Sequence, residues 1–413
     1  MPKRTGTLTS DSRRALSVIL GGRRIGIINR LAGERNLFSF EQDYVDDPGR
    51  PTLSLSFKGR DGGIVLSSRA TATRVPPFFA NLLPEGHLRT YLAERAGVSP
   101  KREFFLLAAL GADLPGGVTV MPFEEDATAT LPGDLEDRQA EPALRFSLAG
   151  VQLKFSAVVE STGGLTIPSN GMGGSWIVKL PSSRFPAVPE NEYAMLELAR
   201  AVGIEVPRVR LVEPSEIRGV PEGVARLDGR ALAIERFDRG MNGARIHMED
   251  FAQVFGLWPD DKYKHRSYAN IAAVLWAEAA EESTFELVRR LAFSTLIGNA
   301  DMHLKNWSLI YPDGRAPVLS PAYDFVATLP YLPDDKHALG FGGSKSLNEI
   351  STEQIRRFVD TARLPASPVA EIIRDTASLT VEAWKALPEK GLLSETMQST
   401  IGKQIERVAA ATG

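Results

Sequence analysis

Two carboxylates and one carboxamide in the C-terminal half of the chain have the types and spacing of a phosphoryl-transfer site. Asp301 and Asn306 lie five positions apart in the run Gly-Asn-Ala-Asp-Met-His-Leu-Lys-Asn at 298–306, and Asp324 follows later. In sites of the protein-kinase type, one carboxylate orients the acceptor hydroxyl, while an amide and a second carboxylate hold Mg²⁺ against the ATP phosphates. We therefore expect Asp301 to be catalytic and Asn306 and Asp324 to be the metal ligands.

The segments around this run are predicted to position it. Phe285–Ile297 has the periodicity of an amphipathic helix, followed by a glycine and an asparagine that are typical of a helix end. Two strand-like runs then flank the turn Pro312-Asp313-Gly314. Because a hairpin brings its outer ends together, Asn306 and Asp324 become neighbours although 18 positions separate them.

Two more side chains of this run are candidates for nucleotide contact. Either Lys305 or His303 would offer the phosphates a polar or charged group. His303 as a zinc ligand is the alternative, but the chain has only five histidines and no His-x-x-x-His pair. Taken singly, an aspartate that caps a turn and an asparagine that starts a strand are ordinary features; the combination indicates a site.

Upstream, Lys179 closes the apolar run Trp176-Ile177-Val178. This is the pattern of the kinase strand whose lysine reaches the ATP phosphates. A glutamate on the next helix would keep that lysine extended through an ion pair, and Glu192 is the expected partner, with Glu190 as the alternative. A lysine at a strand end more often lies along the surface, but its position before the Asp/Asn site favours the nucleotide.

Two other segments lie where a kinase binds its nucleotide. Ser147–Lys154 opens the strand-rich half; it matches neither of the common glycine-rich phosphate motifs, yet its backbone N–H groups would cradle phosphates. Glu235, Arg236 and Phe237 lie where strands give way to helices, which is the place of a hinge that contacts adenine. An ordinary strand end is the other interpretation of these three residues.

Composition excludes several classes of function. The 413 residues are too many for one core, and the charge balance of 48 basic against 51 acidic residues gives no bulk basic surface for nucleic acid. The absence of cysteine rules out disulfides, thiolate catalysis and zinc-thiolate sites. No apolar run approaches ~20 residues, so we expect no membrane span and a cytoplasmic protein.

The pattern of elements predicts an α+β protein with a two-lobed, protein-kinase-like fold. We expect a small N-terminal α/β module at 1–123 and an acidic linker at 124–143. A strand-rich, nucleotide-binding N-lobe at 144–238 and an all-helical C-lobe at 239–413 follow. Within the first module, Leu53–Phe57 alternates as a half-buried strand does.

Several motifs resemble those of the HipA family of serine/threonine kinase toxins, over nearly the whole chain. The matching segments are Phe-Phe-Ala-Asn-Leu-Leu-Pro-Glu-Gly at 78–86, Ala-Ala-Leu-Gly-Ala-Asp at 108–113, Ser-Leu-Ala-Gly-Val-Gln-Leu-Lys at 147–154, Glu-Asn-Glu-Tyr at 190–193, Ile-Glu-Arg-Phe-Asp-Arg at 234–239, the run at 298–306 and Ser-Pro-Ala-Tyr-Asp at 320–324. The resemblance and the patterns above together give the expected ATP contacts: Ala149, Gly150, Val151, Gln152, Leu153, Lys154, Lys179, Glu235, Arg236, Phe237, His303, Leu304, Lys305, Asn306, Tyr323 and Asp324.

The resemblance implies ATP- and Mg²⁺-dependent phosphorylation of a protein serine or threonine. It also implies autophosphorylation on Ser147, an aminoacyl-tRNA synthetase as the substrate, and arrested translation. A small HipB-like antitoxin is implied as the partner, and this chain would contact DNA only indirectly, through that antitoxin. One segment departs from the family pattern, because Lys264 stands where members often carry an acid after Lys-Tyr. If that segment contacts the substrate, the target differs.

Two other functions stay open at this point. In the first, the chain would be a nucleotide-binding corepressor in an antitoxin–DNA complex, without useful catalysis. In the second, it would be a small-molecule phosphotransferase with a similar two-lobed fold. Intact candidate catalytic residues disfavour the first, and the N-terminal module and Ser147 loop disfavour the second.

Overall fold

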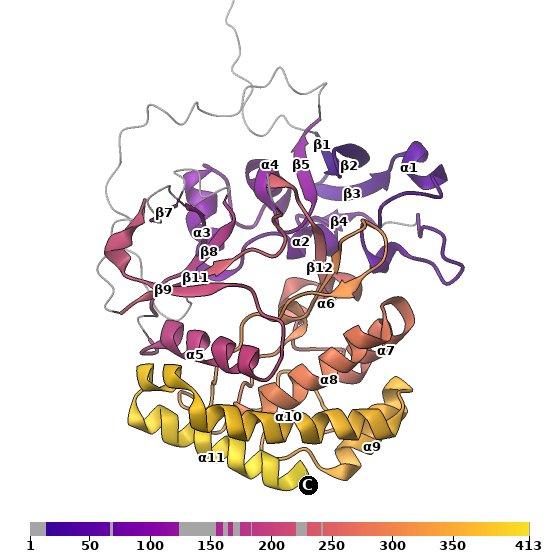
Figure 1. Cartoon of the computed structure of the whole chain (residues 1–413). Coiled ribbons are helices and arrows are strands. Elements are labelled where there is room, and N and C mark those ends of the chain that lie inside the picture. Colours follow the sequence, from indigo (N-terminus) through magenta and orange to yellow (C-terminus); the bar gives the residue numbers. More distant parts are fainter. Residues whose placement is uncertain are drawn as a thin grey trace, which may run out of the picture.

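The structure is a computed structural model, and it describes residues 14–66, 69–123, 154–159, 164–167, 174–182, 184–219, 229–240 and 243–412. Within these residues there are three β-sheets, each assigned to a different part of the chain. Figure 1 shows the sheets of the first two parts in the upper half of the view and the long C-terminal helices below them.

The N-terminal module is a five-stranded antiparallel sheet with short helices. Its strand order is β4-β3-β2-β1-β5, and the first two strands form the tight hairpin whose turn glycines, Gly21 and Gly22, have positive φ. The strands are β1 (Ala15–Leu20), β2 (Arg23–Leu31), β3 (Arg35–Phe40), β4 (Thr71–Ala72) and β5 (Val118–Pro122). The helices are α1 (Gln42–Asp46), α2 (Pro77–Asn81), α3 (Gly86–Arg95) and α4 (Glu103–Leu110), with 3₁₀ turns η2 (Leu55–Phe57) and η3 (Gly111–Asp113).

The strand expected at Leu53–Phe57 is wrong. The segment turns through the 3₁₀ helix η2, with Ser54 accepting a hydrogen bond from the amide of Ser56. Its alternating apolar residues serve two different cores, because Leu53 packs inside the module and Leu55 packs against the C-terminal core. The alternation of apolar and polar residues in this segment therefore comes from a turn that packs against two different cores, and not from a strand.

A six-stranded sheet with the order β10-β7-β6-β8-β11-β9 forms the N-lobe. Its central strand β8 ends at Lys179 and pairs with β6 and β11, which places that lysine in the middle of the sheet. The strands are β6 (Lys154–Val159), β7 (Leu165–Thr166), β8 (Trp176–Lys179), β9 (Val209–Val212), β10 (Ile217–Arg218) and β11 (Ala231–Glu235). The helix α5 (Val188–Ala201) and the turn η5 (Pro214–Glu216) connect them.

Helices dominate the C-terminal part, and α8, α10 and α11 pack against one another in the lower layer of Figure 1. The helices are α6 (Phe251–Val254), α7 (Tyr268–Glu278), α8 (Glu281–Leu296), α9 (Thr352–Ala362), α10 (Ala366–Ala386) and α11 (Glu395–Thr412), with 3₁₀ turns η7 (Pro259–Asp261), η8 (Leu304–Asn306) and η9 (Pro388–Leu392). A small antiparallel sheet is added to them, formed by β12 (His247–Asp250), β13 (Ser308–Tyr311) and β14 (Val318–Leu319). The C-terminal part is thus helical with one small sheet, and not all-helical.

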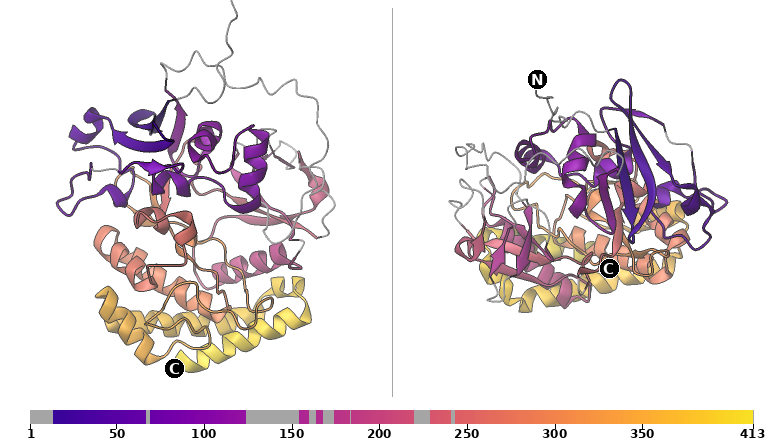
Figure 2. Two further views of the ribbon diagram at one scale, coloured as in Figure 1. Left: turned by 180° about the vertical axis from the view of Figure 1, so that it is seen from behind. Right: turned by 90° about the horizontal axis from the view of Figure 1, so that it is seen from above.

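The N-terminal module packs against both other parts. Tyr91 on α3 makes an edge-to-face contact with Phe155 of the N-lobe sheet, with ring centroids 6.0 Å apart. On the other side, Ser54 donates to the buried carboxylate of Glu249 at 2.5 Å. Both further views in Figure 2 show the module beside the other two parts and not detached from them.

The predicted fold class is confirmed: strand-rich sheets precede a helical C-terminal region. Among the described helices, none combines the length and apolarity needed to cross a membrane.

Candidate active site

The loop 301–306 stands on the end of a long, well-packed helix. Helix α8 ends at Leu296, and Gly298 follows with φ +69°, where a Cβ would lie 2.6 Å from Leu329 Cδ1. Glycine is therefore required both by the left-handed backbone and by the close approach of Leu329. The helix end is held in place, and the loop leaves it in a fixed direction.

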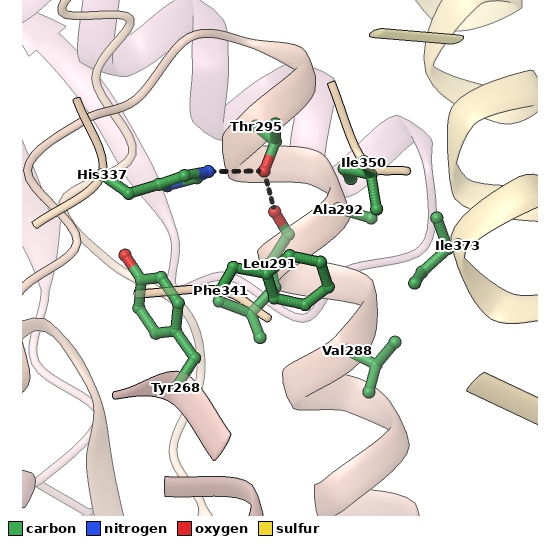
Figure 3. A pocket seen from close by; sticks show the side chains of 9 residues that line it. All are labelled: Tyr268, Val288, Leu291, Ala292, Thr295, His337, Phe341, Ile350 and Ile373. Atoms are coloured by element: carbon green, nitrogen blue, oxygen red, sulfur yellow. Dashed lines mark hydrogen bonds between the residues drawn. The ribbon is translucent and has the colours of Figure 1, made fainter. Parts of the chain in front are cut away.

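A polar pair lies on the inner face of this helix (Figure 3). His337 Nε2 lies 3.3 Å from Thr295 Oγ1, which itself donates to the Leu291 carbonyl at 2.8 Å. Both side chains border a small pocket with otherwise mostly apolar walls. Tyr268 borders it too, and its hydroxyl donates to the Met302 carbonyl at 3.1 Å, so the packing beneath the loop is tied to the loop itself.

The hairpin prediction is confirmed by the pairing of β13 with β14. As expected, the two ends meet: the Tyr323 hydroxyl donates to the Lys305 carbonyl at 3.0 Å and lies 2.5 Å from Ser308 Oγ. Asn299 donates from Nδ2 to the Asp324 carbonyl at 3.3 Å. The loop 301–306 and the segment 323–324 therefore form one unit.

Asp301 lies at the surface of this unit. Its backbone carbonyl accepts a 2.8 Å hydrogen bond from Asn306 Nδ2, and its Oδ1 accepts one of the same length from the Tyr263 hydroxyl. Loss of water around the carboxylate raises the pKa of Asp301, while the Tyr263 hydroxyl and the nearby Lys262 oppose that shift. A carboxylate so placed can accept a hydrogen bond from an acceptor hydroxyl.

Lys179 joins the N-lobe to this unit. Its Nζ lies 2.5 Å from Glu192 Oε1 on α5 and also contacts Asp324 Oδ1. Burial alone would lower the pKa of Lys179, but the two carboxylates outweigh it and raise that pKa. Burial alone would likewise raise the pKa of Asp324, but Lys179 and Lys154 hold it below its usual range. Both groups are therefore charged at neutral pH.

Between the two candidate partners of Lys179, the geometry selects Glu192. The other candidate, Glu190, turns to Arg230 and lies 3.2 Å from its Nε. Lys154 is the residue of the Ser147–Lys154 loop that the structure describes, and its charge acts on both Asp324 and Glu192. Ser147, Ala149, Gly150, Val151, Gln152 and Leu153 lie outside the described residues, as does the acidic linker.

Asp324 has an uncommon backbone conformation. Its φ is +58°, in the left-handed region that costs a residue other than glycine on the order of 1 kcal/mol or more. Such strain is found most often where a side chain must point in a particular direction for function. Here it accompanies the contact of the Asp324 carboxylate with Lys179.

The donor set suits magnesium. Because Asn306 uses Nδ2 on the Asp301 carbonyl, its amide oxygen is left for a cation. Within the described ranges no three His, Cys, Asp or Glu side chains gather as a metal cage. Mg²⁺ is commonly bound through one or two carboxylates with water and substrate phosphates completing the shell, so a carboxylate and a carboxamide fit it.

The Lys305 side chain, an expected nucleotide contact, is paired within the protein. Its Nζ lies 2.9 Å from Glu85 Oε1 and donates to the Asn81 carbonyl at 2.9 Å, so it faces the N-terminal module. His303 is buried, and this burial lowers the pKa of the imidazole to about 3, so the ring is neutral. It packs edge-to-face against Tyr263 with centroids 5.0 Å apart.

The expected hinge is only partly available to adenine. The amide of Glu235 donates to the Arg208 carbonyl, and the amide of Arg236 donates to the Ser175 carbonyl, both at 2.8 Å. The guanidinium of Arg236 is paired with Asp238 at 2.7 Å. Phe237 lies against Tyr323 with ring centroids 5.7 Å apart, which links this segment to the segment 323–324. The Arg236 side chain is therefore committed to the protein and not to a nucleotide.

Three residues of this site were not among the expected ones. Tyr263 contacts Asp301, Asn299 ties Asp324 to the helix end, and Glu85 contacts Lys305. Each belongs to a segment that the sequence singles out, namely 261–266, the helix end and the motif 78–86. Their contacts cross between distant segments, so no local spacing could reveal them.

Comparison with known families and proteins agrees with this geometry. The model of the HipA-like C-terminal domain matches residues 146–384, and that of the HipA N-terminal domain matches residues 16–121. A Sinorhizobium fredii protein named as a kinase, Y4dM, is 51% identical over 380 residues, which are 91% of each chain. The serine/threonine-protein kinase toxin HipA of Shewanella oneidensis is 25% identical over 342 residues, 73% of this chain and 74% of that one.

A solved structure extends the likeness to the fold. It contains HipA and HipB of Shewanella oneidensis with their operator DNA, and one of its chains superposes with a TM-score of 0.72 over 96% of both chains at 22% identity. The arrangement of all three parts of this chain is therefore a known one.

Proposed function

Because the chain belongs to the HipA family of kinases, we propose that it is an ATP- and Mg²⁺-dependent protein serine/threonine kinase. One observation supports this most: Lys179, from the centre of the N-lobe sheet, meets Asp324, 145 positions later, at the loop that carries Asp301 and Asn306. A lysine, a metal-binding carboxylate and a catalytic carboxylate brought together by separate lobes are the parts that phosphoryl transfer requires.

On the nucleotide side, each residue has a separate task. The Lys179 ammonium group binds phosphate oxygens, and Glu192 keeps it extended through their 2.5 Å contact. Asp324 and Asn306 would hold Mg²⁺, which neutralises charge on the phosphates when bound. Lys154 adds positive charge near the same carboxylates.

On the acceptor side, Asp301 orients the serine or threonine hydroxyl and receives its proton. The hydroxyl oxygen forms a bond to the γ-phosphorus, the bond between that phosphorus and ADP breaks, and the proton passes to the Asp301 carboxylate. Tyr263 donates to Oδ1 of that carboxylate and so orients it.

We propose Ser147 as a site of autophosphorylation and an aminoacyl-tRNA synthetase as the substrate, in the cytoplasm, with translation arrested as the result. A dianionic phosphate on Ser147, at the start of the nucleotide loop, would repel the ATP phosphates and inhibit the enzyme. The Shewanella structure contains HipB and operator DNA. We therefore propose a HipB-like antitoxin as the partner, with DNA contacted through it.

The direct test is phosphate transfer from labelled ATP in the presence of Mg²⁺. We expect wild type to label Ser147 and a protein in a cell lysate, and Asp301→Ala to lower both rates by about a hundredfold or more. Asp360→Asn, an exposed acid on α9, is the matched control and should leave both rates unchanged. Equal labelling by wild type and Asp301→Ala would contradict the proposal, as would transfer to sugars or aminoglycosides alone.

A second function is favoured by the same Shewanella complex, namely that of a corepressor. The chain would then strengthen operator binding by the antitoxin without catalysis. Asp301→Ala should in that case bind the antitoxin–operator complex as tightly as wild type does, and gel-shift titration measures this. The two functions can coexist in one molecule.

A further inference from the structure

One carboxylate of the N-terminal module is shared by two lysines of the active-site region. Glu85 Oε2 accepts a 2.9 Å hydrogen bond from Lys262 Nζ, and its Oε1 lies 2.9 Å from Lys305 Nζ. The Glu85 side chain is 37% exposed, that of Lys262 22% and that of Lys305 14%, so water screens these pairs in part. Although burial alone would raise it, the two lysines lower the pKa of Glu85 to about 2.

The two lysines belong to the two segments that surround Asp301. Lys305 lies in the loop 301–306 itself. Lys262 precedes Tyr263, whose hydroxyl contacts Asp301 Oδ1 at 2.8 Å. The two segments also contact each other directly, because the Leu304 amide donates to the Lys262 carbonyl at 3.1 Å. Glu85 thus joins the loop that carries Asp301 to the segment that carries its hydrogen-bond donor Tyr263.

Neighbouring residues of the module support this arrangement. Asn81, on α2, accepts from Lys305 through its backbone carbonyl and donates from Nδ2 to the Leu257 carbonyl at 2.8 Å. Gln253 donates to the Phe78 carbonyl at 3.0 Å. The motif at 78–86 therefore lies against the acceptor side of the site, while Lys179 and Glu192 lie on the nucleotide side.

We propose that Glu85 is a positioning residue for the acceptor side: it holds the loop 301–306 and the segment 259–266 at a fixed separation, and thereby sets the orientation of Asp301. This inference rests on the proposed kinase function for its catalytic consequence but not for its structural one. Without the carboxylate, two ammonium groups would face each other, and Lys305 would keep the neutral Asn81 and, as its charged partner, the more distant Asp250 at 3.7 Å.

Glu85→Gln is the informative variant, because glutamine keeps the size of the side chain and removes its charge. Glu85 is the residue before α3 and makes no side-chain cap hydrogen bond there, so the variant costs the helix no such bond. Glu94→Gln, an exposed site on the same helix, is the matched control. If Glu85→Gln fails to fold, Lys262→Gln replaces it, since that variant removes one of the two lysines that contact Glu85.

Hydrogen–deuterium exchange of the full chain measures the structural part. We expect peptides covering 259–266 and 299–307 to exchange about tenfold faster in Glu85→Gln than in wild type or Glu94→Gln, with peptides of the N-lobe sheet unchanged. Unchanged exchange in both segments, or equal acceleration over the whole chain, would overturn the proposal.

Kinetics measure the catalytic part. In Glu85→Gln we expect kcat for phosphate transfer to fall about ten- to a hundredfold, while the Kd for ATP, measured by calorimetry, changes less than about twofold. A fall in ATP affinity with unchanged kcat would overturn the assignment to the acceptor side. If wild type transfers no phosphate but exchange still accelerates in the two segments, the kinase proposal fails and the positioning role of Glu85 stands.

Discussion

At the scale of single residues, charge and hydrogen bonding decide what the site can do. Lys179 lies between two carboxylates, Glu192 and Asp324, and one of them is the expected metal ligand. In the proposed function, a cation bound by Asp324 would leave Lys179 paired with Glu192, and the lysine could then turn its remaining protons to phosphate. Under this proposal, Glu192 would stay the partner of Lys179 while Asp324 is released to the cation.

Tyr263 offers a test at this scale. Because its hydroxyl donates to Asp301 and opposes the rise in the pKa of that carboxylate, Tyr263→Phe should raise the Asp301 pKa. The acidic limb of the pH–rate profile should then move to higher pH, and kcat should fall by about tenfold. Tyr193→Phe, on α5, is the control. An unmoved acidic limb would show that Tyr263 does not act through Asp301.

At the scale of elements, the helix α8 and the β13–β14 hairpin deliver the catalytic groups. Both were predictable from sequence, because helical periodicity, the glycine at the helix end and the turn at 312–314 are local signals. It was also predictable that a glutamate on the next helix would pair with Lys179. Contacts that cross between segments, such as Lys305 with Glu85 and Arg236 with Asp113, were not, since the same lysine or arginine would suit a nucleotide equally well.

Gly298→Ala tests the helix end. The added Cβ would meet Leu329 at 2.6 Å in a left-handed backbone, and we expect a loss of about 2–4 kcal/mol in unfolding free energy. Gly256→Ala is the matched control, because φ is +61° there and nothing lies within 4 Å of its Cβ, so it should cost only about 1 kcal/mol. Denaturant titration measures both, and equal losses would mean that the contact with Leu329 contributes nothing.

At the scale of the whole molecule, the N-terminal module is bound to the rest through buried polar groups. Glu249 is fully buried; its carboxylate accepts from Ser54 Oγ and Tyr311 Oη, each at 2.5 Å, and from the Leu55 amide at 3.0 Å. Burial raises the pKa of Glu249 to about 7 although these donors oppose the shift. Since the folded pKa lies above the unfolded one, this group disfavours the folded state increasingly as pH rises from about 4.5 to 7.

Ser54→Ala tests this junction. Removing one donor leaves the buried Glu249 carboxylate less satisfied, so we expect a loss of about 1–3 kcal/mol that grows as the pH rises through about 7, where the folded wild-type carboxyl ionises. The control is Ser56→Ala, whose hydroxyl contacts Ser54 and not Glu249. A loss that is the same well below and well above pH 7 would indicate that Glu249 does not titrate near that pH.

The central claim is that Asp324 and Asn306 bind one divalent cation beside Asp301. Anomalous diffraction from crystals grown with Mn²⁺ and a non-hydrolysable ATP analogue tests it most directly. The account predicts a manganese peak about 2–2.5 Å from the Asp324 carboxylate and the Asn306 amide oxygen, with the terminal phosphate facing Asp301. A peak bound by other side chains, or a nucleotide lying away from Lys179, would contradict it.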